Sequence, residues 1–210
     1  MLNSLDNAER ICNKESLEFQ LSFMALFIGM FEFMKDTLLS RVEWFLCCEE
    51  RRNSNGEWVN VHSELYINEI ERRIVEGKES KDRLRNTMLW FKDAGAITED
   101  DYSLYRELRE KRNSYTHNMT EHIWNGLPGE DAKALSDLLD LYAKLDKWWI
   151  NKIEIPISGD FAPGSYDEES VESMALLTFK MMINTLYGGK SEEYLEMIRK
   201  HREQQGHGHS

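Results

Sequence analysis

The stretch TEDDYSLYRELREKRNSYTHNM, residues 98–119, decides the predicted fold because its apolar residues repeat at helical spacing. The residues on this apolar stripe are Tyr105, Leu108, Tyr115 and Met119. Thr98 is a good N-terminal cap, and the three acidic residues after it favour the positive end of a helix dipole. The stretch therefore predicts one long helix from Thr98 to about Met119.

One position interrupts the apolar stripe. The gap between Leu108 and Tyr115 is filled by Arg112, so a guanidinium lies on the side that should face the core or a partner helix. A permanent charge there is costly unless it is paired or binds an anion. Two explanations stay open. The stem of Arg112 lies along the stripe with its head at water or a carboxylate, or the guanidinium binds an anionic ligand.

The polar residues around Arg112 fall along a common edge of the predicted helix. Residues five apart are separated by about 140° around the axis, so Arg112 and His117 can border one groove without sharing a face. Arg109, Asn113 and His117 are spaced by four residues and share an edge, beside the stripe that carries Arg112 and Tyr115. A groove lined by these groups suits a phosphodiester, because arginine binds phosphate oxygens and histidine transfers protons near neutral pH.

The hexapeptide Arg112-Asn113-Ser114-Tyr115-Thr116-His117 carries a family resemblance. An Arg, a polar residue, and a His five positions after the Arg form the signature of the HEPN superfamily. The chain resembles a HEPN protein of the Arg-x4-His type. That family places the motif late on a helix of a small all-α bundle, which is the setting predicted for this chain.

The resemblance implies a metal-independent endoribonuclease, in which the 2′-hydroxyl of RNA attacks the adjacent phosphorus. It implies that Arg112 and His117 are the catalytic pair, that Asn113 orients them, and that Arg109 and Tyr115 lie beside the substrate. It also implies a homodimer whose two motif helices build one composite site. The expected role is that of a toxin, or a protein of phage or stress defence, with a nucleotidyltransferase-like antitoxin as partner.

The alternative is a HEPN-like helical module that binds RNA, a nucleotide or a protein partner without catalysis. The net charge of −12 favours this alternative, because a general nucleic-acid-coating surface would be basic. Residues 103–117 nevertheless carry a local net charge of +2, so an RNA site would be narrow and contact few phosphates. In this alternative His117 is only a cation near the C-terminal end of a helix dipole.

The remaining sequence predicts an all-α fold, a HEPN-like bundle with additional C-terminal helices. No proline precedes Pro128, and neither a β-strand nor an internal repeat is predicted. Further helices are expected at about 16–52, 61–76, 81–93, 131–152 and 165–187, with a short one after Ser191. The expected organisation is a bundle over 1–152, a loop over 153–164, C-terminal helices packed on the same domain over 165–203, and a flexible tail over 204–210.

The sequence predicts no metal, no cofactor, no disulfide and no membrane association. The three cysteines match no disulfide or metal-ligand pattern and indicate a reducing cytoplasm: Cys12, Cys47 and Cys48. His201, His207 and His209 lie in a polar tail without a carboxylate partner. The apolar run Leu21–Phe31 is too short to span a bilayer and predicts a buried helix.

Weaker candidate residues lie outside the hexapeptide. His122 and Trp124 follow it closely and could flank a groove, and Trp148-Trp149 could stack on bases. Packing is the competing explanation for each of these aromatic residues, and at least one of the two adjacent tryptophans is expected in the core.

Overall fold

The structure is a computed structural model that describes residues 4–47, 49–127, 131–159 and 165–189. It comprises two compact units, residues 1–145 and 146–210, and helix α7 (Asp131–Trp149) runs across the division between them. The described residues are mainly helical, with only short antiparallel strand pairs, so the predicted all-α fold is confirmed. The predicted division at residues 152 and 165 stays a prediction.

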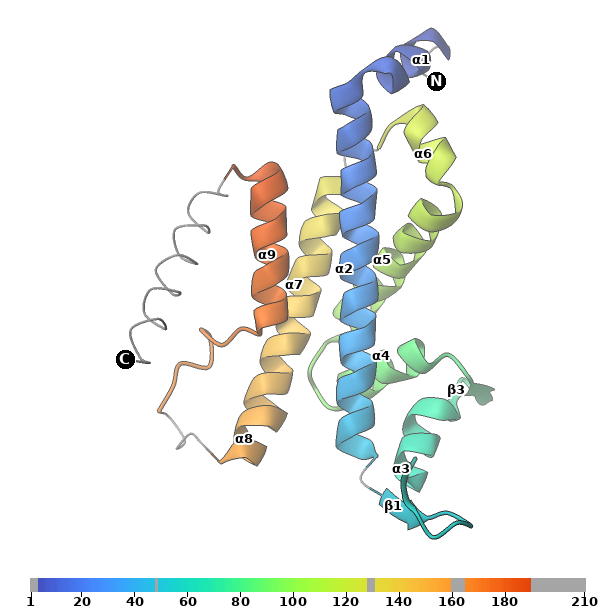
Figure 1. Cartoon of the computed structure of the whole chain (residues 1–210), viewed down its shortest axis with the longest axis vertical. Coiled ribbons are helices and arrows are strands. Elements are labelled where there is room, and N and C mark those ends of the chain that lie inside the picture. The colour runs from blue at the N-terminus through green and yellow to red at the C-terminus, as the bar shows by residue number, and fades with distance from the viewer. Residues whose placement is uncertain (1–3, 48, 128–130, 160–164, 190–210) are drawn as a thin grey trace. The chain divides into compact units, whose positions relative to one another are not determined.

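Helix α2 (Lys14–Leu46) is the central element of the first unit (Figure 1). It begins at Asn13, whose side chain accepts a hydrogen bond from the Ser16 amide at 2.9 Å. Its buried residues recur at helical spacing: Phe23, Phe27, Met30, Met34, Leu38 and Val42. Because it contacts α1 (Ser4–Cys12), α4 (Arg83–Asp93), α5 (Glu99–His117) and α6 (Met119–Asn125), much of its surface is covered by protein.

By length and composition alone, α2 could also cross a membrane. Its most apolar 18-residue window has a mean hydropathy of 1.4, and 44% of that window is buried inside the protein. The core helix of a soluble protein meets the same criterion, as does a signal sequence near an N-terminus. The predicted cytoplasmic location and absence of membrane association therefore stay predictions.

Helix α5 carries the hexapeptide and follows the predicted pattern. Thr98 and Asp101 form a capping box at its start, and Tyr102, Tyr105, Leu108 and Tyr115 are buried. The helix ends at His117, two residues earlier than predicted, because the backbone at Asn118 leaves helical geometry with φ −117° and ψ 27°. Met119 starts α6 and is 37% exposed, so the prediction that it continues the stripe was wrong.

Helix α6 is bound to α1, although Arg10 and Trp124 are 114 residues apart in the sequence. The Arg10 guanidinium donates to the Trp124 carbonyl oxygen at 3.0 Å and to the Asn7 side chain at 2.7 Å. Gly126 follows with φ +81°, and a Cβ there would lie 2.6 Å from the Arg10 guanidinium. Glycine therefore suits this position on both backbone and steric grounds.

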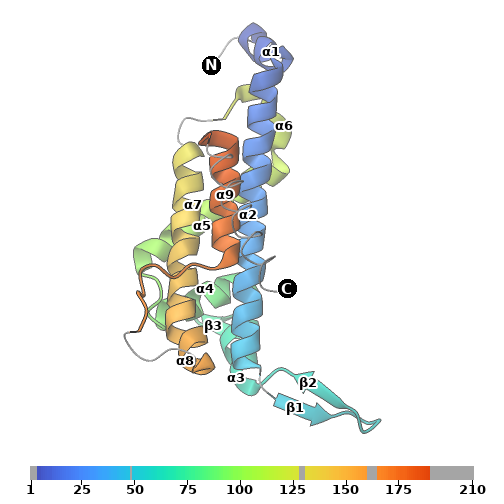
Figure 2. The same cartoon turned by 60° about the vertical axis from the view of Figure 1, so that its left-hand side comes forward.

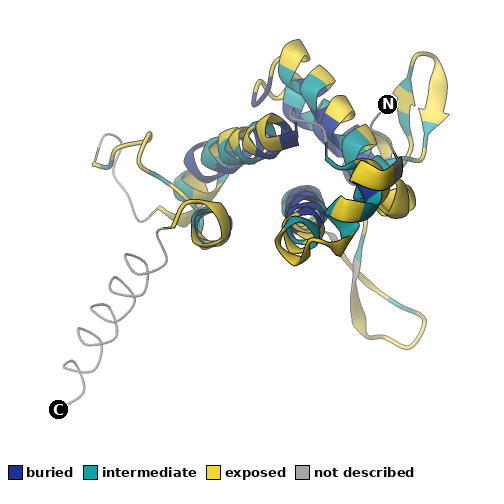
Figure 3. Cartoon of the chain, turned by 90° about the horizontal axis from the view of Figure 1, so that it is seen from above, coloured by how far each residue is buried: buried dark blue, intermediate teal, exposed yellow. Residues whose placement is uncertain are grey.

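Two β-hairpins correct the predicted helix boundaries. The first pairs β1 (Glu49–Arg52) with β2 (Trp58–Val61), so α2 ends at Leu46 instead of about Arg52. Figure 2 shows this hairpin extending from the end of α2. Figure 3 shows that exposed residues dominate the hairpins, whereas buried residues gather on helix faces. The physical reason is local: the Asn53–Gly56 turn lets the chain reverse, and the Arg52 guanidinium lies 5.1 Å from the Trp58 ring centre.

The second hairpin replaces part of a predicted helix. β3 (Arg73–Val75) pairs with β4 (Lys78–Ser80) around Glu76 and Gly77, which have φ of 53° and 77°. Two consecutive residues with positive φ form a reversing turn that a helix cannot contain. The predicted helix over 61–76 is therefore reduced to α3 (Glu64–Tyr66) and the π-helical turn η1 (Ile67–Glu71).

Asn86 of α4 joins the π-helical turn to the second hairpin. Its buried side-chain amide donates to the Ile70 carbonyl oxygen at 2.8 Å and to the Ser80 carbonyl oxygen at 2.9 Å. Asn86→Ala is expected to lower the free energy of unfolding by about 1–3 kcal/mol, because two carbonyl groups lose their donor. Chemical denaturation measures the change, with the exposed Asn55→Ala as control, expected within about 0.5 kcal/mol of wild type. Equal unfolding midpoints for Asn86→Ala and wild type would contradict this.

Asp101 gives the start of α5 an acid-sensitive contact. Burial acts to raise the pKa of Asp101, but hydrogen bonds from Lys144 and Thr98 outweigh it and lower the pKa below its usual 3.8. A carboxyl with a lower pKa in the folded state stabilises the fold above its unfolded pKa, and this stabilisation is lost as pH falls through the folded pKa. Asp101→Asn is therefore expected to melt earlier at neutral pH, with the difference from wild type shrinking below about pH 3.8. Thermal melts over the acid range test this, and a constant difference would oppose it.

The second unit begins within the last turn of α7. The described part continues through the π-helical turn η2 (Ile150–Glu154) and α8 (Ile155–Ser158), so the predicted loop over 153–164 was wrong at its start. Asp146 is buried and accepts a hydrogen bond from the Ser173 amide at 2.9 Å.

The last described helix starts later than predicted. Helix α9 (Met174–Tyr187) is capped by Ser173, whose hydroxyl accepts from the Leu176 amide at 3.2 Å. The predicted start at Ser165 was wrong, because Glu168 and Glu169 instead contact Asn151 and Lys147 and hold residues 165–173 in turns. The predicted helix after Ser191, the tail over 204–210 and its three histidines lie outside the described residues, as does Cys48.

Candidate functional site

Arg112 projects from α5 toward α2. Its Nε lies 3.0 Å from Glu32 Oε1, and its guanidinium carbon lies 5.1 Å from the centre of the Phe31 ring. The Nε contact has the distance of an ion pair but not the alignment of a hydrogen bond, because this buried nitrogen has no hydrogen-bond partner. The structure therefore shows the first of the two explanations for Arg112, in which its head group meets a carboxylate.

The two terminal nitrogens of Arg112 are not paired with a carboxylate in the way that Nε is. The side chain is 20% exposed, and within the described residues its terminal Nη1 and Nη2 groups make no hydrogen bond. Glu32 also pairs with Lys35, and hydrogen bonding to Glu32 raises the pKa of Lys35. Glu32 thus contacts Nε of Arg112 and leaves Nη1 and Nη2, here called the outer fork of the guanidinium, available to a ligand.

His117 and Asn113 are the other two polar residues of the motif. His117 is the last residue of α5 and is exposed, and Asn113 lies one turn earlier and is half-buried. No hydrogen bond from either side chain is found in the described part of the chain. Both side chains therefore remain free to bind a ligand at the end of the helix.

Arg109 is held more firmly than the sequence suggested. Its Nη1 donates to Asp82 at 2.6 Å and to the Tyr105 hydroxyl at 3.3 Å. Burial raises the pKa of Tyr105 to about 12, so this phenol stays neutral at physiological pH. Asp82 also caps α4, because it accepts from the Arg85 amide at 3.0 Å. Arg109 therefore links α5 to the start of α4.

A cavity of about 700 Å³ lies along α4 and α5, here called the α4–α5 cavity. Arg109 and Asn113 both line it. Its other cations are Arg85, Lys92 and Arg106, and its carboxylates are Glu76, Asp82, Glu99 and Glu110. Equal numbers of positive and negative side chains make it polar without a large net charge.

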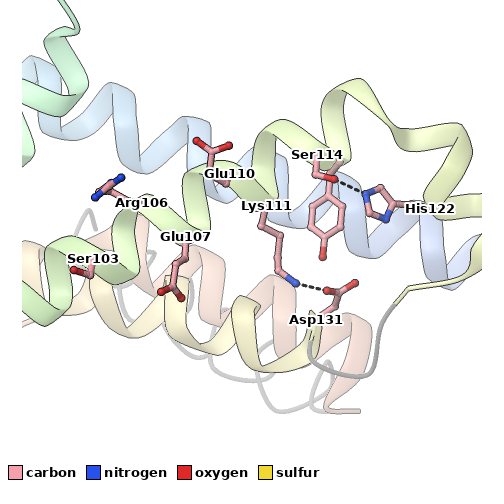
Figure 4. Close-up of a pocket in the computed structure, with 9 residues that line it drawn as sticks. Ser103, Arg106, Glu107, Glu110, Lys111, Ser114, His122 and Asp131 are labelled. Atoms are coloured by element: carbon pink, nitrogen blue, oxygen red, sulfur yellow. Dashed lines mark hydrogen bonds and ion pairs between the residues drawn. The ribbon is translucent and has the colours of Figure 1, made fainter. Parts of the chain in front are cut away.

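A second cavity of about 770 Å³ contains Tyr115 and is here called the Tyr115 cavity (Figure 4). In it Lys111 pairs with the buried Asp131, and Ser114 Oγ lies 2.8 Å from His122 Nε2. The His122 ring packs edge-on against Tyr115 at 5.1 Å between centres. Burial, and next the nearby Asp131 carboxylate, raise the pKa of Tyr115, although its hydroxyl and Asp131 Oδ2 do not meet in hydrogen-bond geometry.

The five predicted site residues do not line one cavity. Arg109 and Asn113 line the α4–α5 cavity and Tyr115 lines the Tyr115 cavity, whereas neither cavity is lined by Arg112 or His117. The predicted groove is thus divided between two sides of α5.

The structure also adds residues that sequence reasoning did not join to the site. Glu32 directly follows the apolar run Leu21–Phe31, and nothing in its spacing indicates a contact with Arg112. Ser114 lies inside the hexapeptide, but its contact with His122 depends on the bend at Asn118. Trp149 is a core residue, as expected for one of the two adjacent tryptophans, and Trp124 is 43% exposed.

Comparison with protein-family models, with curated proteins and with solved structures finds no match for this chain. Among the described residues, no three His, Cys, Asp or Glu side chains are grouped so that they could hold a metal ion. The HEPN resemblance and the metal-free, cofactor-free site stay predictions.

Proposed function

We propose that this chain is a metal-independent endoribonuclease of HEPN type. The observation that carries the proposal is the contrast between side chains at the end of α5. Arg109 and Lys111 are bound to carboxylates. Among the described residues, by contrast, His117, Asn113 and the Nη1 and Nη2 groups of Arg112 have no hydrogen-bond partner. Free polar groups of these types, on the motif that resembles the family, suit a phosphodiester substrate.

The proposed reaction is attack by the RNA 2′-hydroxyl on the adjacent phosphorus. The bond between O2′ and phosphorus forms, the bond between phosphorus and O5′ breaks, and the product carries a 2′,3′-cyclic phosphate. The Arg112 fork stabilises the charge on the non-bridging oxygens, and the His117 imidazole transfers a proton. Asn113 orients these groups from the preceding turn.

A second copy of the chain completes this site in the proposal. The reaction needs one proton removed from O2′ and one delivered to O5′, and each chain supplies one motif imidazole. A homodimer that brings two α5 ends together supplies both. Light scattering at micromolar concentration is expected to give the mass of a dimer. A monomer that cleaves RNA would contradict the composite site.

The proposed biological role is that of a toxin or of a protein in phage or stress defence, acting in the cytoplasm. A neutralising antitoxin, such as a nucleotidyltransferase-like protein, is the proposed partner. Incubation of purified protein with cellular RNA in the presence of EDTA is the direct test of the activity. Cleavage to 2′,3′-cyclic phosphate ends is expected, and loss of cleavage on chelation would contradict the metal-independent reaction.

A non-catalytic HEPN-like module is the second candidate. The observation that favours it is the Arg112–Glu32 contact, because a structural ion pair alone explains an arginine on this stripe. The net charge of −12 points the same way. This candidate predicts binding of RNA, a nucleotide or a protein without cleavage of any RNA.

A further inference from the structure

We infer that the α4–α5 cavity binds the RNA strand beside the scissile phosphate, and that Arg85 and Arg106 hold its backbone phosphates. The inference rests on the proposed function and identifies the part of the surface along which its substrate lies. Phosphate binding is thereby assigned to Arg85 and Arg106 in place of Arg109.

The position of the cavity on α5 leads to the end of the motif. At 100° per residue, Arg106, Asn113 and His117 lie within about 40° of each other around the helix axis. Arg106 and Asn113 both line the cavity, and His117 follows Asn113 by one turn on the same edge. The rise from Arg106 to His117 is about 16 Å. A strand with its reacting phosphate at His117 can therefore run along this edge into the cavity.

The Tyr115 cavity is less suited to the same strand. Its residues Lys111 and Tyr115 lie about 160° around the axis of α5 from Asn113, so this part of the cavity is on the opposite side of the helix. Of the two cations that line it, Arg106 also lines the α4–α5 cavity, and Lys111 is already bound to the buried Asp131. Removing Lys111 from that contact would leave a buried charge unpaired. The α4–α5 cavity is thus the one that contains Asn113, and beside Arg106 it offers a second available arginine, Arg85.

The cations of the α4–α5 cavity differ in how firmly they are held. Arg109 donates to Asp82 at 2.6 Å, and Lys92 donates to Glu99 at 2.8 Å while lying over the Tyr102 ring. These two are occupied by contacts within the fold. They hold α4, α5 and the intervening turn together, and we assign them no direct role in phosphate binding.

Arg85 and Arg106 are the two available cations, one on each wall. Arg85 lies 3.5 Å from Glu76, whose side chain is 86% exposed, and such exposed pairs contribute little stability. Arg106 is exposed and has no ion pair within the described residues. A guanidinium from α4 and another from α5 can each bind two phosphate oxygens, which lysine cannot reproduce.

The carboxylates of the cavity limit what it can bind. Four of them face the four cations, so a long polyanion lying over the whole protein would be repelled. A short single-stranded segment that contacts two phosphates fits this charge distribution. The same balance predicts that neutralising the carboxylate beside Arg85 strengthens binding.

The test is equilibrium binding of a short, fluorescein-labelled, fully 2′-O-methylated single-stranded RNA, which cannot undergo internal attack. Arg85→Ala and Arg106→Ala are each expected to weaken binding about 10-fold or more. Each should also reduce the slope of log affinity against log salt by about 0.7, the loss of one single-strand phosphate contact. Arg52→Ala, an exposed arginine on the first hairpin, is the matched control and should leave both quantities unchanged.

Glu76→Gln is expected to change RNA affinity in the opposite direction from the two arginine variants. It removes the charge that competes for Arg85 and keeps a side chain of the same shape at this positive-φ position. RNA binding is expected to become several-fold tighter, and this gain should vanish in the Glu76→Gln/Arg85→Ala double variant. Free phosphate and a mononucleotide, added as competitors, should displace the RNA only at far higher concentration than unlabelled strand.

The outcomes separate failure of this inference from failure of the proposed function. If wild type cleaves RNA but both arginine variants keep wild-type affinity and salt slope, the α4–α5 cavity is not the strand site. Displacement by a mononucleotide as effectively as by RNA would also overturn it. If wild type neither binds nor cleaves RNA, the proposed ribonuclease itself is wrong.

Discussion

Arg112→Ala and His117→Ala are each expected to reduce RNA cleavage by about 100-fold or more while leaving the helical fold intact. Arg112 would lose the fork that stabilises charge on the phosphate, and His117 would lose proton transfer. Cleavage of a labelled RNA under single-turnover conditions measures the loss, and circular dichroism checks the fold. The fold should survive Arg112→Ala because Glu32 keeps its second partner, Lys35.

Further variants at the same positions sharpen this expectation. Arg112→Lys should also fail, because an ammonium cannot make the two-pronged phosphate contact. Asn113→Ala should be milder if this residue only orients the pair. The Arg112→Ala/His117→Ala double variant should be little slower than either single variant, since both residues serve one step.

Glu32→Gln separates a catalytic Arg112 from a structural one. If Arg112 serves only to pair with Glu32, Glu32→Gln and Arg112→Ala should lower cleavage and stability alike. If Arg112 binds phosphate, Glu32→Gln should retain most of the cleavage that Arg112→Ala removes. Undiminished cleavage by His117→Ala would overturn the assignment of the site.

Tyr115→Ala is expected to lower the free energy of unfolding by about 3–5 kcal/mol, the range for truncating a buried aromatic side chain. Tyr115 is 1% exposed and packs edge-on against Phe27 at 5.2 Å and Phe23 at 6.3 Å between ring centres. Its removal would leave a cavity between α5 and α2 and expose Asp131 and His122. Urea denaturation measures the change.

Tyr115→Phe is the matched control for the hydroxyl. This group is buried and makes no hydrogen bond with the described residues, so its loss should change the free energy of unfolding little or raise it slightly. RNA binding and cleavage should also persist in Tyr115→Phe, because the hydroxyl is not accessible to a substrate. A large loss of RNA affinity in this variant would restore Tyr115 to the substrate-binding residues.

Sequence reasoning succeeded where the pattern is local. The N-terminal cap at Thr98 and the buried positions Tyr105, Leu108 and Tyr115 lie within one helix, and cap preference together with helical periodicity predicts them. It failed at the hairpins, where Glu76 and Gly77 take positive φ. A glycine after a charged residue reads equally well as the end of a helix.

The candidate site was harder to predict because its partners are distant in sequence. The contacts of Arg112 with Glu32 and of Arg109 with Asp82 join different helices, and no periodicity records which carboxylate meets which arginine. The prediction of a narrow RNA site from the net charge of residues 103–117 assumed that all the arginines in this segment are available to bind RNA. The three-dimensional pairing shows that Arg109 and Lys111 are used by the fold, whereas Arg106 forms no ion pair within the part of the chain that the structure describes.

The contact between α1 and α6 makes the surroundings of the hexapeptide depend on residues near the N-terminus. Arg10 holds the Trp124 carbonyl, and α6 in turn carries the His122 that meets Ser114. Shortening the chain through Cys12 would therefore remove the contacts of α6 with α1, and leave those with α2 and α5, without touching any residue of the hexapeptide. Limited proteolysis at α1 should be a sensitive way to disturb the end of α5.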